Sequence, residues 1–293
     1  MRAGSPAGSG RLVGDMRLTK HHGLGNDFLV LLDPDASHPL DPEVARALCA
    51  RHTGIGADGI IRAVPATNGG PARVAMELYN ADGSRAEMSG NGIRCLAQAL
   101  LLAGWAEPPA VRIATDAGVR TISVHRPVDR STALLEVDMG AVRLGGETGE
   151  WTGGPLRRAS WANMGNPHLV VEVEGVFDGD DQLTAAVDLV ALGEKVNAAV
   201  DGGANVHLLL RSGAGADRIV IRTYERGVGL TQACGTGACA SAAVARSWGL
   251  VGDRVAVDMP GGTAQVRLGD AVALIGPATF VATIDVPDTP VEP

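Results

Sequence analysis

The sequence predicts an α+β protein made of two pseudosymmetric domains, each an antiparallel sheet or barrel wrapped around a central helix. Three observations support this prediction. Many short apolar runs are separated by glycine turns, as in antiparallel sheets. Each half of the chain contains one long alanine-rich helical segment. Related short motifs also recur in the same order in the two halves, which is typical of a duplicated unit. The length of 293 residues suits about two domains.

The amino-acid composition argues against several classes of partner before any motif is considered. The net charge is −8, and aromatic residues make up 3% of the chain, so a nucleic-acid partner is not expected. No apolar run approaches the roughly 20 residues that cross a bilayer, so no membrane partner is expected. The four cysteines show no CxxC pair, and residues 1–16 carry no apolar leader segment. We therefore expect a cytoplasmic protein with a flexible tail at 1–16.

The first half is expected to contain two helices among short strands. Asp41 followed by Pro42 is a helix-start signal, and it predicts a helix over 41–51. An alanine- and leucine-rich run ending at Gly104 predicts a helix over 91–104. The apolar runs before, between and after these helices predict strands over 28–32, 59–64, 74–79, 111–114, 119–124 and 133–137.

The second half follows the same style. Apolar positions at helical spacing predict a helix over 183–196, and an alanine-rich run predicts another over 236–248. Short apolar runs predict strands over 169–173, 206–210, 218–224, 254–257, 264–268 and 280–284.

An internal repeat is the most informative feature of the sequence. Residues 89–105 and 234–250 align with a constant separation of 145 residues. The alignment pairs Ser89 with Cys234 and matches the glycines that follow them. Upstream, the segments around Asn26 and Asn166 are also alike. Two alanine-rich helices could match through composition alone, but the conserved order of several motifs favours a duplicated half.

The repeated turn predicts a site for a carboxylate. Each half places a Ser/Cys-Gly-x-Gly turn directly before a helix, where free N–H groups and the helix dipole attract anions. A thiol at a helix N-terminus is expected to have a lowered pKa and to act as a base. If the two halves face each other, a side chain lies on either side of one α-carbon. That arrangement suits removal of a proton from one face and its return on the other.

These motifs resemble those of the diaminopimelate epimerases, a cofactor-independent family of amino-acid epimerases. The resemblance implies two similar domains with a cleft between them. It assigns 17–132 to the first half, 133–277 to the second, and a last strand near 278–288 that returns to the first. The segments that carry it, spread over about 17–285, are 22–28, 51–59, 80–84, 87–92, 164–168, 224–227 and 234–237.

The resemblance also implies roles for individual residues. It makes Cys234 and the residue at position 89 the acid/base pair; the family has a cysteine there, whereas this chain has Ser89. It implies that the substrate is a small molecule, that neither metal nor cofactor is needed, and that the protein is a homodimer. The residues implied to bind the α-carboxylate are Gly90, Asn91, Gly235 and Thr236. Those implied to bind the amino groups and the distal carboxylate are Asn26, Asn80, Asn166, Asn205, Glu225 and Arg226, with His168 beside the reacting carbon.

The sequence leaves alternatives open. The expected reaction converts LL- to meso-diaminopimelate for lysine and peptidoglycan synthesis. A racemase or epimerase of another amino acid, such as histidine or a proline derivative, is a second reading. A non-catalytic amino-acid-binding homologue is a third, because Ser89 is a weaker base than a cysteine. Ser89 itself fits an engineered inactivating change, a natural variant that relays the proton through water, or a degenerate site.

Overall fold

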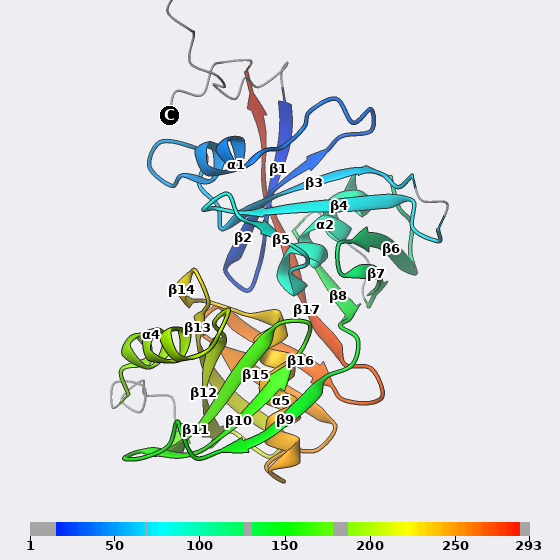
Figure 1. Cartoon of the computed structure of the whole chain (residues 1–293). Coiled ribbons are helices and arrows are strands. Elements are labelled where there is room, and N and C mark those ends of the chain that lie inside the picture. Colours follow the sequence, from blue (N-terminus) through cyan, green and yellow to red (C-terminus); the bar gives the residue numbers. More distant parts are fainter. Residues whose placement is uncertain (1–15, 68–69, 126–130, 178–186, 288–293) are drawn as a thin grey trace, which may run out of the picture.

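A computed structural model describes residues 16–67, 70–125, 131–177 and 187–287. Its elements form two lobes, one above the other in Figure 1. The elements of the first lobe are β1 (Met16–Gly23), β2 (Asn26–Leu32), α1 (Pro42–Cys49), β3 (Gly59–Pro65), β4 (Val74–Asn80), β5 (Arg85–Ala86), α2 (Gly90–Leu102), β6 (Ala110–Thr115), β7 (Gly118–Val124) and β8 (Thr132–Asp138).

The second lobe begins after β8 and ends with a long strand that reaches back into the first. Its elements are β9 (Arg143–Thr148), β10 (Leu156–Asn163), β11 (Pro167–Phe177), α4 (Leu189–Ala199), β12 (Asn205–Ser212), β13 (Arg218–Glu225), β14 (Gly229–Thr231), α5 (Gly235–Ser247), β15 (Arg254–Met259), β16 (Gly262–Arg267) and β17 (Ala273–Val286).

The two lobes repeat one topology, which confirms the predicted fold class. Elements β1 to β8 and β10 to β17 follow the same order of strands and helices. The strand pairings also match: β1–β2 and β10–β11 are antiparallel, whereas β2–β3 and β11–β12 are parallel. The sheets are therefore mixed, and not purely antiparallel as expected. The reason is that a crossover through a helix returns the chain to the end of the sheet where the previous strand began. The next strand then runs in the same direction, which produces a parallel pair.

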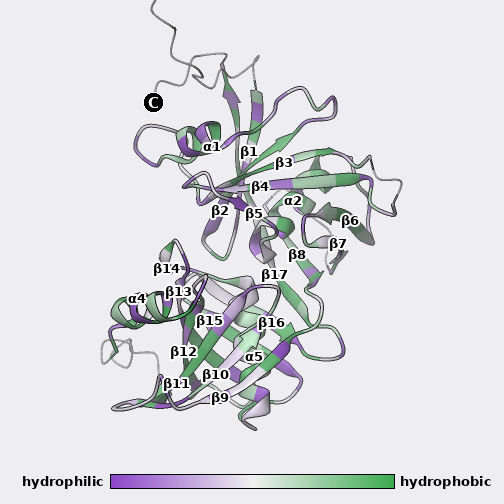
Figure 2. Ribbon diagram, viewed as in Figure 1, coloured by the Kyte–Doolittle hydropathy of each residue, from purple (hydrophilic) through white to green (hydrophobic). Residues whose placement is uncertain are grey.

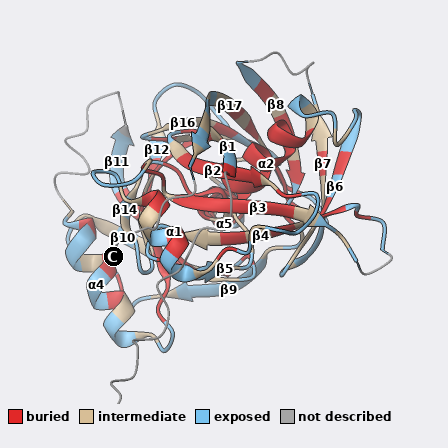
Figure 3. Cartoon of the chain, turned by 90° about the horizontal axis from the view of Figure 1, so that it is seen from above, coloured by how far each residue is buried: buried red, intermediate tan, exposed pale blue. Residues whose placement is uncertain are grey.

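The central helices α2 and α5 are buried on nearly all sides. In α2 every residue from Gly90 to Leu100 is buried, and α5 is lined by small buried residues such as Ala238, Ala242 and Ala245. Figure 3 shows α2 and β3 mainly in the buried colour, while β9 at the rim is largely exposed. Strands thus enclose each central helix and fix where its first turn points.

The outer helices α1 and α4 cover the sheets by one face only. Figure 2 shows hydrophilic and hydrophobic residues side by side on α4. Its Gly193 lies so close to Tyr224 on β13 that an added Cβ would be 2.4 Å from the ring. The helix starts at Leu189 because the side chain of Asp188 accepts a hydrogen bond from Ala191 N. The predicted start at 183 is therefore wrong over 187–188, and residues 183–186 lie outside the described ranges.

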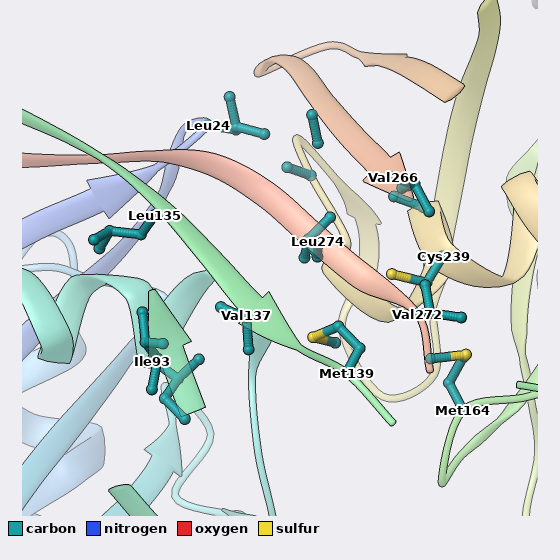
Figure 4. Close-up of a cluster of buried hydrophobic side chains, with 14 of the residues drawn as sticks. Leu24, Ile93, Leu135, Val137, Met139, Met164, Cys239, Val266, Val272 and Leu274 are labelled. Carbon is teal, nitrogen blue, oxygen red and sulfur yellow. The ribbon is translucent and has the colours of Figure 1, made fainter. Parts of the chain in front are cut away.

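One hydrophobic core extends through both lobes. It joins residues of α2, such as Ile93, to residues of α5, such as Cys239. Strand β17 runs through this core and pairs with β16, β8 and β1. In Figure 4, Leu274 of β17 lies between Val137 of β8 and Val266 of β16. The two helix N-termini are therefore held by a continuous apolar core.

Pairing partners change between β8, which pairs with β7, and β9, which pairs with β10. This change falls a few residues after the predicted boundary at 132/133, which stays a prediction. Met16 was expected in the tail, but it is buried and begins β1; residues 1–15 lie outside the described ranges. Strands β9 and β10 were not expected, because β9 is glycine-rich and exposed and β10 carries two adjacent arginines near its start.

Candidate active site

The two repeated turns meet at the centre of the molecule. Ser89 caps α2, and its Oγ accepts a hydrogen bond from Gly92 N at 3.1 Å. Cys234 caps α5 in the same way, and its Sγ accepts from Gly237 N at 3.3 Å. A Cβ added to Gly235 would lie 3.3 Å from the Cα of Gly90. The positive ends of two helices therefore face one region.

The polar residues come from matching strand ends. Strands β2 and β3 are parallel and begin where the antiparallel strand β4 ends. Asn26 and Asn80 therefore lie at the same end of the sheet. In the second lobe β11 and β12 begin where β13 ends, and His168 pairs with Asn205 at that end. In each lobe, these predicted residues therefore lie at the end of the sheet where the central helix begins.

In the first lobe a chain of hydrogen bonds fixes Asn26. Its Nδ2 donates to Asp58 Oδ2 at 2.7 Å, and its Oδ1 accepts from Asn91 Nδ2 at 3.1 Å. Arg51 donates to the other Asp58 oxygen at 2.7 Å. Asp58 was not a predicted site residue, although it lies in segment 51–59, one of the segments that carry the family resemblance. Asn80 stands apart from this chain and donates to Ser84 Oγ at 3.0 Å.

In the second lobe Cys234 lies beside a carboxylate. The charge of Glu225 acts on its thiol, and Glu225 accepts a hydrogen bond from Thr231 Oγ1 at 2.6 Å. Burial raises the pKa of Glu225. Burial, and next the negative charge of Glu225, raises the pKa of the Cys234 thiol, while hydrogen bonds from Thr236 and Gly237 N oppose the rise. The expected lowering of this pKa is therefore wrong, because burial outweighs the helix terminus.

Arg226 lies at the same end of the sheet. Its backbone N–H donates to Asn205 Oδ1 at 2.9 Å, and its Nη1 donates to Gly202 O at 2.6 Å. The side chain is exposed, so further guanidinium donors remain for an incoming anion. A role for Arg226 in binding a distal carboxylate stays a prediction.

A buried chain of two histidines crosses the second lobe, and sequence reasoning found only one of them. His168 Nε2 bonds to Asn166 Oδ1 at 2.8 Å, and His168 Nδ1 bonds to His207 Nε2 at 2.8 Å. Thr223 Oγ1 closes the chain on His207 Nδ1 at 3.0 Å. An amide oxygen only accepts, so His168 Nε2 carries the proton and His207 donates to His168. His207 was missed because no sequence signal distinguishes it from a core residue of β12.

Burial keeps these histidines neutral and should make the protein acid-labile. Burial lowers the pKa of His168 to about 3, and it lowers those of His207 and His21 in the same direction. Below about pH 6.5 the unfolded chain binds protons that the folded chain does not, so stability falls with falling pH. For His168 alone we expect a loss of about 2 kcal/mol at pH 5 relative to pH 8. Urea denaturation at both pH values measures it, and equal stabilities would contradict the prediction.

The Glu225–Cys234 contact predicts a change in thiol reactivity. Glu225→Gln removes the charge that raises the pKa of the Cys234 thiol, so more thiolate should form at pH 8. We expect alkylation of Cys234 by iodoacetamide to be faster by about tenfold. Peptide mass spectrometry follows the labelling of this cysteine alone. An unchanged or slower rate would show that Glu225 does not control the thiol.

Over the described ranges, no group of three His, Cys, Asp or Glu side chains could hold a metal ion. Among the described helices, none is long and apolar enough to cross a membrane.

Solved structures of other proteins share this fold. A hydroxyproline epimerase from Agrobacterium vitis, crystallised with trans-4-hydroxy-L-proline, matches with a TM-score of 0.69 at 18% identity over 96% of this chain and 95% of that one. A Bacillus anthracis protein of the phenazine-biosynthesis PhzF family matches with a TM-score of 0.71 at 14% identity over 94% and 99%. The chain has the two-lobed fold that such proteins share.

Sequence comparison is more specific. The family model described as diaminopimelate epimerase matches residues 18–145 and 160–281. A diaminopimelate epimerase from Thermobifida fusca is 39% identical over 92% of this chain and 98% of its own length. One from Nostoc punctiforme is 37% identical over the same shares. The chain belongs to the diaminopimelate epimerase family, and it is an isomerase.

Proposed function

We propose that the protein epimerises LL-2,6-diaminopimelate to meso-diaminopimelate by proton transfer at the α-carbon. The observation that carries this proposal is the contact between the two helix N-termini, which are capped by Cys234 and Ser89. The first N–H groups of each helix have no acceptor within the helix. They can bind one α-carboxylate between them, which leaves the α-carbon between the thiol and the hydroxyl.

In the first step Cys234 exchanges the α-proton on its face. Burial, and next the negative charge of Glu225, raises the pKa of its thiol and favours the protonated form. A substrate ammonium beside Glu225 would offset that charge and favour the thiolate. The thiolate then takes the α-proton as the Cα–H bond breaks, and the electron pair moves into the carboxylate. The backbone N–H groups at both helix N-termini stabilise this charge.

In the second step the opposite face receives a proton. Ser89 lies there as a hydroxyl held by Gly92 N. Its O–H can donate to the carbanion, and the alkoxide then regains a proton from water. Because an alcohol is a poor base, removal of a proton on this face is slower than donation to it. The reaction is therefore slower in the direction in which Ser89 must remove the α-proton.

Cytoplasmic location, a homodimer and a place in lysine synthesis complete the proposal. The family has a role in lysine biosynthesis, and the relatives named above are diaminopimelate epimerases. We infer that this chain works in the same setting. Size-exclusion chromatography with light scattering tests the dimer, and a monomer at micromolar concentration would contradict it.

A substrate panel tests the proposed activity. The purified protein is incubated with LL-diaminopimelate, L-histidine and trans-4-hydroxy-L-proline, and the products are separated by chiral chromatography. We expect inversion of diaminopimelate only, because the Asn205–Arg226 end of the second lobe offers donors for a second amino-acid head. Inversion of either other amino acid, with none of diaminopimelate, would replace the proposal by the second reading.

A further inference from the structure

Arg94 is a fully buried cation that the proposed reaction does not use. It lies in the first turns of α2, and its exposed fraction is 0%. No carboxylate among the described residues forms an ion pair with it, although buried arginines are normally paired. Arg62, which is also buried, shows the usual arrangement, with ion pairs to Asp33 and Glu77. An unpaired buried cation needs another explanation.

Its guanidinium instead holds three oxygen atoms around the start of α2. Nη1 donates to Gly90 O at 3.0 Å, Nη2 to Asn91 Oδ1 at 2.6 Å, and Nε to Pro277 O of β17 at 3.4 Å. The group fits tightly, since a Cβ added to Gly276 would lie 3.1 Å from its Cζ. Burial lowers the pKa of Arg94 to about 10, so the group remains charged at neutral pH.

Through Asn91 this arginine reaches the other lobe. Because Asn91 Oδ1 is held by Arg94, its Nδ2 must point the other way. There it donates to Ala233 O at 3.2 Å and to Asn26 Oδ1 at 3.1 Å. Ala233 directly precedes Cys234. A continuous chain therefore runs from the buried cation in the first lobe to the thiol-bearing turn of the second.

The repeat shows that the buried arginine is present in one lobe only. The position that matches Arg94 in α5, 145 residues later, is Cys239, an uncharged residue buried in the core. The cation was therefore not needed simply to build the lobe, because the second lobe forms the same topology without it.

We propose that Arg94 is a positioning residue: it fixes the Asn91 amide, and through Ala233 it holds the Cys234 turn against the first turn of α2. The catalytic consequence rests on the proposed function, whereas the effect on the Cys234 turn does not. Arginine suits this task because its planar fork donates in several fixed directions at once, while a lysine ammonium is a compact point charge.

The test compares two cysteines of one helix. Arg94→Met keeps the side-chain bulk but removes the donors, and Arg62→Met is the matched control for loss of a buried arginine elsewhere. Iodoacetamide labelling at pH 8 is followed separately at Cys234 and Cys239 by peptide mass spectrometry. We expect Arg94→Met to label Cys234 about tenfold faster than the unmodified chain, because its turn opens locally. Cys239 should label no faster, because Arg94 lowers the pKa of its thiol and loss of that charge can only slow labelling there. Arg62→Met should change neither rate.

Several outcomes would overturn the proposal. Equal acceleration at both cysteines would mean that Arg94 is merely structural, and an unchanged Cys234 rate would mean that the chain does not hold the turn. Arg94→Lys separates charge from geometry: we expect it to behave like Arg94→Met, and full protection of Cys234 by lysine would contradict the fork-based account.

Turnover is measured in parallel. We expect Arg94→Met to lower kcat for diaminopimelate by about 100-fold, whereas Arg62→Met should retain the rate per folded molecule. If the unmodified chain does not turn over diaminopimelate at all, the proposed function fails, but the labelling experiment still decides the role of Arg94.

Discussion

Replacing Ser89 by cysteine should raise the rate of diaminopimelate epimerisation by about 10²- to 10⁴-fold, the usual contribution of a competent general acid or base. A thiol is a far better base than an alcohol near neutral pH. The change should fit, because Cys234 already shows a thiol accepting the equivalent hydrogen bond from Gly237 N at 3.3 Å. Steady-state kinetics with LL- and meso-diaminopimelate measure the gain.

The matched control is Ser89→Ala, which removes the hydroxyl and should lower the rate below that of the unmodified chain. It also removes an N-cap, so its stability should fall by about 1 kcal/mol, and rates are compared per folded molecule. A folded Ser89→Cys variant that binds diaminopimelate but gains no activity would contradict the placement of this side chain opposite Cys234.

Replacing Cys234 by alanine should abolish detectable exchange of the α-proton. Cys234 is the only cysteine at either helix cap, and its thiol is the better of the two proposed acid/base groups. We expect the exchange rate to fall by at least about 10³-fold, because the variant lacks the stronger base of the proposed acid/base pair. Proton NMR in deuterated water measures the exchange directly.

Cys239→Ala provides the control for this variant. Cys239 lies on the same helix, one turn further into the core, and forms no part of the site. It should lower stability and leave the exchange rate per folded molecule nearly unchanged. Retained exchange in folded Cys234→Ala would assign the chemistry to a different residue.

The repeat made the fold predictable, because it exposed two copies of one topology. It also located the capped turns at Ser89 and Cys234 correctly, since glycine turns before alanine-rich helices are strong local signals. Strand β9 was missed for a physical reason: it is exposed and glycine-rich, and it is held in the sheet by its pairing with β10. Such a strand has no hydrophobic period to detect.

The supporting residues of the site were less accessible to sequence reasoning. Asp58 and His207 bond to partners far away in the chain. Arg94 bonds to Gly90 and Asn91 within its own helix, but it reaches β17 and the second lobe only through tertiary contacts, so no local pattern reveals these roles. The pKa of Cys234 also depends on burial and on Glu225, both of which come from tertiary packing. The sequence predicts where a helix begins. It does not predict whether the helix terminus or burial has the larger effect on the pKa of the thiol.

The central claim is that Cys234 exchanges the α-proton on one face and that Ser89 serves the other face less well. Its most direct test is α-deuteration of LL- and of meso-diaminopimelate by the unmodified chain in deuterated water, with stereochemistry followed on the same samples. We predict exchange from both isomers at clearly unequal rates, with the faster rate belonging to the isomer whose α-proton faces Cys234. Bound diaminopimelate without exchange from either isomer would contradict the account and favour a non-catalytic binding protein.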